Sequence, residues 1–101
     1  MSDFTKVAAF SELADNSIRT VEIGGRKLAV ARVGQAVHVI DNTCCHKGGP
    51  LGEGTLNGTA VSCPWHGWRF DVSTGACLNN PAAKVPCYET KVENGQVLVK
   101  L

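Results

Sequence analysis

The sequence predicts an all-β protein in which antiparallel strands form a base, with a smaller unit inserted between them at about residues 43–83. Three observations support this fold. Apolar and polar residues alternate in short runs along much of the chain. Gly24-Gly25 and Asn94-Gly95 are dipeptides typical of two-residue hairpin turns. No helix longer than one turn is indicated. A length of 101 residues suits one domain, residues 1–101, with a modest core.

The base is expected to contain two hairpins and a strand between them. Its strands are predicted, in chain order, over residues 18–23, 27–33, 36–40, 88–93 and 96–101. The inserted unit has short strands over residues 59–63 and 69–72, and one helical turn is predicted at residues 11–14, capped by Ser11. Alternation places eight apolar side chains in the core: Val21, Ile23, Leu28, Val30, Val37, Val39, Val97 and Val99.

Composition is that of an ordinary folded protein, with 44% hydrophobic and 19% charged residues. The formal net charge of +1 gives no reason to expect a nucleic acid or a membrane as partner. No apolar stretch approaches the roughly 20 residues of a membrane span, and the N-terminus shows no signal segment. These features lead us to expect a cytoplasmic protein.

Two short motifs bring cysteine and histidine together. Cys44-Cys45-His46 and Cys63-Pro64-Trp65-His66 each supply one thiolate and one imidazole. This ligand set suits a [2Fe–2S] cluster in which two histidines replace two cysteines on one iron. Two adjacent loops can each contribute one ligand of each kind, and glycines beside both motifs, such as Gly49 and Gly67, allow the backbone to approach the sulfur atoms closely.

The motifs and the residues around them resemble the Rieske family. The resemblance runs from Asn42 to Pro81 and includes the segments Cys-Cys-His-Lys-Gly-Gly-Pro-Leu and Cys-Pro-Trp-His-Gly-Trp-Arg-Phe-Asp-Val-Ser-Thr-Gly. It implies a Rieske-like fold with a cluster-binding subdomain at about residues 43–83. It also implies one [2Fe–2S] cluster, with Cys44 and Cys63 on one iron and His46 and His66 on the other. Asn80-Pro81-Ala82 would correspond to the family's proline-containing loop over the cluster.

The histidine ligands raise the reduction potential. An oxidised cluster with two thiolates and two neutral imidazoles carries no net charge, so it accepts an electron more readily than an all-cysteine cluster at about −400 mV. High-potential Rieske proteins carry an extra cysteine in each motif and place a serine and a tyrosine after the second motif. Here Gly49, Trp65, Trp68 and Phe70 stand at those places. The missing hydroxyl donors predict a potential near the low end of the family's range, about −150 mV.

The resemblance implies an electron-transfer component and not an enzyme. Such a ferredoxin passes single electrons from a flavin-dependent ferredoxin reductase to a terminal oxygenase of the ring-hydroxylating dioxygenase type. The chain has no room for the mononuclear iron domain of an oxygenase. We expect a monomer.

Two alternatives remain at this point. Two cysteines and two histidines are also a common zinc set, although zinc fingers usually pair cysteine with cysteine and histidine with histidine. The second alternative is a small Rieske subunit of a larger redox enzyme such as nitrite reductase.

Other residues are interpreted more simply. Cys77 and Cys87 are expected to be buried, and Cys45 to turn away from the cluster. His38 is expected to face solvent, and Trp68 to pack in the interior. Trp65 suits either packing or docking, because aromatic residues are enriched at interfaces. Lys47 and Arg69 are interpreted as solvated charges that could also steer an acidic partner.

Overall fold

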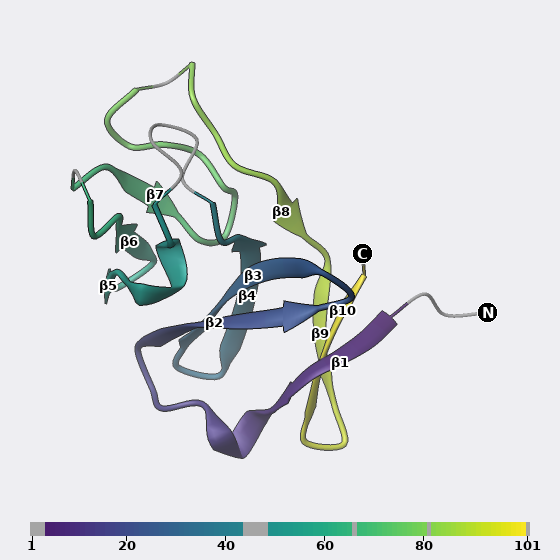
Figure 1. The fold of residues 1–101 in the computed structure, drawn as a ribbon. Helices are drawn as coiled ribbons and strands as arrows, with labels where there is room; N and C mark the ends of the chain where they lie inside the picture. The colour runs from purple at the N-terminus through teal and green to yellow at the C-terminus, as the bar shows by residue number, and fades with distance from the viewer. Residues whose placement is uncertain (1–3, 44–48, 66, 81, 101) are drawn as a thin grey trace.

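The computed structural model describes residues 4–43, 49–65, 67–80 and 82–100. The described elements are almost all strands, joined in antiparallel pairs into three sheets (Figure 1). In chain order they are β1 (Phe4–Ala9), η1 (Phe10–Glu12), β2 (Ser17–Ile23), β3 (Arg26–Val33), β4 (Ala36–Asp41), η2 (Leu51–Glu53), β5 (Thr55–Asn57), β6 (Ala60–Ser62), β7 (Arg69–Asp71), β8 (Cys87–Tyr88), β9 (Thr90–Glu93) and β10 (Gln96–Lys100). The predicted all-β architecture is confirmed.

Two sheets form the base. One has the strand order β2-β3-β4-β8, and the other has the order β1-β10-β9. The third sheet, β5-β6-β7, is inserted in the chain between β4 and β8. Figure 1 shows this small sheet on the opposite side of the molecule from β1 and β10. None of the helices in the described part of the chain is long and apolar enough to span a membrane.

The hairpin turns follow from glycine and asparagine. Gly24 and Gly25 adopt φ values of 56° and 82° between β2 and β3. Asn94 and Gly95, at 53° and 75°, do the same between β9 and β10. Two consecutive residues with positive φ match the twist of an antiparallel hairpin, which is why these dipeptides predicted the turns correctly.

Strand β3 is buried on both faces. Leu28 and Val30 pack between the two base sheets, while Ala29 and Ala31 face the inserted unit. The core between the two base sheets also contains Val39 from β4 and Val97 and Val99 from β10. The second core, between β3 and the inserted unit, contains Leu51 and Phe70. Six of the eight predicted core residues are buried; Val21 and Ile23 are half-buried because β2 is an edge strand.

Three local predictions need correction. The helical turn is a 3-10 helix over Phe10–Glu12, so Ser11 lies inside it, and the Glu12 carboxylate accepts the Ala9 N–H at 3.0 Å. The predicted strand over residues 88–93 is divided between two sheets, because Tyr88 pairs with β4 and Thr90 with β10. Strands β1 and β5 were not predicted. Strand β5 is three residues long, and such a segment gives little alternation to detect.

Candidate metal centre

Cys63 immediately follows β6 and begins the segment of residues 63–68, which we call the second loop. The Cys63 N–H donates to the Trp68 carbonyl at 2.7 Å, and the Gly67 N–H donates to the Cys63 carbonyl at 3.0 Å. Gly67 has a φ of +72°, a conformation in which glycine is unstrained. Backbone bonds and one glycine therefore close this loop at the end of the β6–β7 hairpin.

The second loop touches the segment that follows the first motif. The Cys63 side chain is buried, at 3% exposure, and Gly49 is buried beside it. A Cβ atom at Gly49 would lie 2.7 Å from Cys63 Sγ and 3.1 Å from Trp65 Cγ. Only glycine fits there, so the backbone after the first motif lies directly against the sulfur of the second. The expected close approach of glycine backbone to a cysteine sulfur is confirmed for Gly49 and Cys63, while the first motif itself lies outside the described residues.

The two tryptophans of the second loop have different surroundings. Trp68 is half-buried against the core that contains Phe70, as predicted. Trp65 is 57% exposed, although one side of its indole contacts Gly49. Trp65 therefore covers backbone next to Cys63 and also presents a large apolar surface to solvent.

Residues 42–52, the first loop, begin at the end of β4, and the structure describes both of its ends. Thr43 pairs with Pro50, and the Asn42 carbonyl accepts the Leu51 N–H at 2.6 Å. Asn42 itself is buried. The two ends of the loop are thus held side by side where η2 begins.

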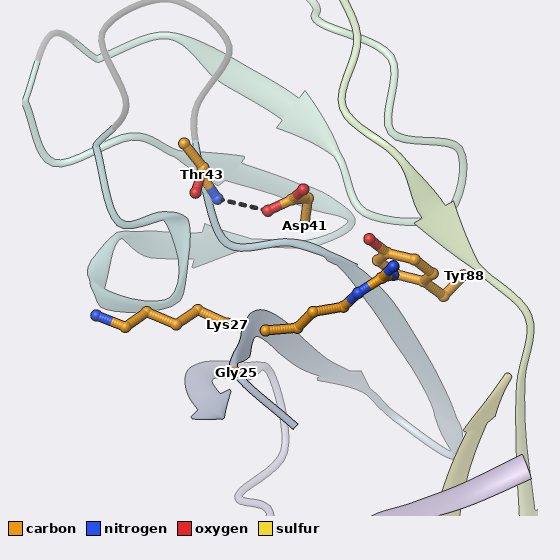
Figure 2. A pocket seen from close by; sticks show the side chains of 6 residues that line it. Gly25, Lys27, Asp41, Thr43 and Tyr88 are labelled. Carbon is orange, nitrogen blue, oxygen red and sulfur yellow. Dashed lines mark hydrogen bonds between the residues drawn. The ribbon is translucent and has the colours of Figure 1, made fainter. Parts of the chain in front are cut away.

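A pocket of about 500 Å³ opens beside the start of the first loop (Figure 2). The Asp41 carboxylate accepts the Thr43 N–H at 3.0 Å, the hydrogen bond drawn as a dashed line in Figure 2. Cys63 is not among the described residues that line this pocket, and none of the lining side chains is a soft metal ligand. The lining residues are Gly25, Arg26, Lys27, Asp41, Thr43 and Tyr88.

Of the four predicted ligands, Cys63 lies within the described residues. Cys44, His46 and His66 lie outside them, as do Cys45, Lys47 and Pro81. Within the described part of the chain, no group of three or more His, Cys, Asp or Glu side chains is placed to hold a metal ion. The complete ligand set therefore remains a prediction.

The two remaining cysteines differ from each other. Cys77 is buried, as predicted, but Cys87 is exposed, so that prediction was wrong. Cys87 lies on β8, where its Sγ is 3.6 Å from the Ser73 carbonyl oxygen. Partial burial, and secondly the negative charge of Asp71, raise the pKa of the Cys87 thiol. His38 is half-buried, and Arg69 is exposed as a solvated charge should be.

Residues 3–89 match the Rieske [2Fe-2S] domain family. Ferredoxin CarAc of Metapseudomonas resinovorans is 40% identical over 97 residues, which cover 93% of this chain and 90% of that protein. The fold also resembles the ferredoxin of carbazole 1,9a-dioxygenase from Nocardioides aromaticivorans IC177. That structure has a TM-score of 0.91 and 30% identity, over 97% of each chain. A third likeness is a structure described as a complex of reduced oxygenase and oxidized ferredoxin in carbazole 1,9a-dioxygenase. It has a TM-score of 0.89 and 35% identity, over 99% of this chain and 94% of that one.

The base of antiparallel strands with an inserted β5–β7 unit is the fold shared with these ferredoxins, and together with the family match it indicates a small iron–sulfur electron carrier. The chain belongs to the Rieske [2Fe-2S] domain family. Its cofactor is a [2Fe–2S] cluster, and its function is electron transfer.

Proposed function

We propose that this chain is the ferredoxin component of a ring-hydroxylating oxygenase system. In this role it takes one electron at a time from a flavin-dependent ferredoxin reductase and delivers it to a terminal oxygenase, while the chain itself catalyses no oxygenation. The observation that carries the proposal is the likeness, over nearly the whole chain, to Ferredoxin CarAc and to the ferredoxin in the oxygenase complex. We propose that the chain acts as a monomer in the cytoplasm.

We further propose that Cys44 and Cys63 ligate one iron and His46 and His66 the other, within a cluster-binding subdomain of about residues 43–83. The described residues fit such a cluster. Cys63 offers a buried sulfur, and the absence of a side chain at Gly49 lets backbone approach that sulfur. Iron–sulfur clusters need thiolate ligands, and hydrogen bonds and burial around the sulfur atoms tune their potential.

The chain's own residues then have separate tasks. The cluster, when bound, supplies one-electron redox chemistry at a fixed place. The hydrogen bonds that close the second loop fix the position of Cys63. Gly49 allows the first loop to pack directly against the Cys63 sulfur. Trp65 shields the backbone beside Cys63 and offers apolar surface near the site, a feature enriched where proteins dock.

A reconstituted electron-transfer chain tests this function. The purified protein is mixed with NADH, a flavin-dependent ferredoxin reductase and the oxygenase of carbazole 1,9a-dioxygenase. We expect carbazole-dependent NADH oxidation that requires this protein and disappears in Cys63→Ser. A protein that binds a [2Fe–2S] cluster but exchanges no electron with either the reductase or the oxygenase would contradict the carrier role.

A further inference from the structure

Asn42 is a buried polar side chain at the foot of the first loop. At 4% exposure, it is the sole polar or charged residue classed as buried in the described part of the chain. Its Oδ1 atom accepts two hydrogen bonds, from the Thr20 hydroxyl at 3.1 Å and from the Gly52 N–H at 2.6 Å. A buried amide oxygen is stable only when such donors are present.

Three parts of the fold converge on Asn42. Thr20 belongs to β2, and Gly52 to η2, on the far side of the loop. From β3, the Lys27 carbonyl accepts the Asn42 N–H at 3.2 Å. Asn42 therefore joins strands β2 and β3 to η2, the segment at the far end of the first loop.

Gly52 shows how closely these groups are packed. A Cβ atom there would overlap the Thr20 hydroxyl and would lie 2.6 Å from the Thr20 backbone nitrogen and 2.7 Å from Asn42 Oδ1. No side chain fits between β2 and the loop at this point. Thr20, Asn42 and Gly52 thus pack against one another, and their hydrogen bonds form only because Gly52 has no side chain.

We propose that Thr20, Asn42 and Gly52 form a latch that fixes both ends of the first loop to the base sheet and thereby positions Cys44 and His46. Asn42 is a positioning residue, since it acts on the cluster through the ligands two and four residues later in the chain. The proposal rests on the proposed function, insofar as that function makes Cys44 and His46 ligands.

The latch predicts how the cluster is lost. Opening of the first loop separates Gly52 from Asn42 and exposes both ligands to competing chelators. Removing one stabilising hydrogen bond makes such an opening about fivefold more frequent. The Thr20→Val variant does this with little change in shape and keeps a β-branched residue in the strand.

Iron release tests the latch. Wild type, Thr20→Val, Thr20→Ser and Thr90→Val are incubated with an iron chelator below the unfolding temperature. Thr90→Val is the matched control, because Thr90 lies on β9 in the other base sheet, and its hydroxyl donates to the Tyr88 carbonyl of β8 at 3.0 Å. We expect about fivefold faster release in Thr20→Val. Thr20→Ser and Thr90→Val should release iron at the wild-type rate, and the EPR g values of the reduced cluster should shift in Thr20→Val alone.

The outcomes separate the latch from the proposed function. Wild-type release and unchanged g values in Thr20→Val, or equal effects in Thr20→Val and Thr90→Val, would overturn the latch. A wild-type protein without a cluster would overturn the proposed function instead. In that case, hydrogen exchange of the Gly52 amide tests the latch. Exchange about fivefold faster in Thr20→Val than in wild type supports the latch, and an unchanged rate overturns it.

Discussion

The first and second loops are anchored in different ways. The first loop is tied to β2 and β3 by long-range bonds, including a side-chain bond between residues 22 positions apart. The second loop is closed by local backbone bonds between Cys63, Gly67 and Trp68. The two loops meet where Gly49 lies against Cys63. One half of the site thus depends on tertiary structure, while the other is largely formed by its own hairpin.

The contact between the loops should be the most sensitive point. In Gly49→Ala the new methyl group would lie 2.7 Å from Cys63 Sγ, and it cannot be accommodated unless the loops separate. We expect this variant to lose most of its bound iron, measured as iron per protein. Gly58→Ala, in the β5–β6 turn, is the control: its added methyl meets no described atom within 4 Å, and its φ of +63° adds only backbone strain of about 1 kcal/mol, so it should retain the cluster. Full iron content in Gly49→Ala would show that the loops do not need this contact.

The reduction potential tests the surroundings of the second loop. Trp68 and Phe70 carry no hydroxyl group that could donate toward the cluster. With these donors absent, the reduced cluster is less stabilised, and we expect a midpoint of about −150 mV in a spectroscopic redox titration. A midpoint well above zero would mean that other donors replace them.

The local closure of the second loop is tested by Gly67→Ala. No atom of the described residues lies within 4 Å of a Cβ atom built at Gly67, but its φ is +72°, so the cost of alanine there is backbone strain of about 1 kcal/mol. Gly95→Ala, at a φ of +75° in the β9–β10 turn, carries the same strain away from the site. Both variants should lower the melting temperature by about 4–8 °C. Faster iron release is expected in Gly67→Ala alone, and equal release from both variants would argue against a role of this turn in the site.

The smallest effect concerns Cys87, which is exposed yet lies outside both loops. Its raised pKa keeps the thiol protonated at neutral pH, so alkylation by iodoacetamide should be slower than that of free cysteine. The rate should keep rising with pH after free cysteine has levelled off. Asp71→Asn removes the second cause of the shift, and it should speed the reaction at pH 8, measured by peptide mass spectrometry. Alkylation of Cys87 as fast as free cysteine at neutral pH would contradict the raised pKa.

Much of the fold could be predicted because its turns and strands have local signals. Gly24-Gly25 and Asn94-Gly95 identified two hairpins, and alternation found the core between the base sheets. The second core could not be predicted this way. Ala29 and Ala31 are small residues on the opposite face of β3, and they are buried only because the inserted unit packs over them.

The candidate site divides in the same way. Residue type and spacing in the two motifs predict the four ligands, and Gly49 beside the first motif predicts close approach of backbone to a sulfur atom. Asn42 was not recognised, because its importance depends on Thr20, which reaches it only through the pairing of β2 with β3. An asparagine between a strand and a ligand motif is a usable signal, but its partners require the tertiary structure.

The most direct test of a cluster shared between the two loops is pulsed EPR of the dithionite-reduced protein labelled with ¹⁵N-histidine. We expect nitrogen couplings from two histidines that change with the label, in a protein whose oxidised form has the visible absorption of a [2Fe–2S] cluster. A reduced cluster without histidine coupling would contradict ligation by His46 and His66. A colourless protein that binds one zinc ion, even after anaerobic reconstitution, would contradict electron transfer altogether.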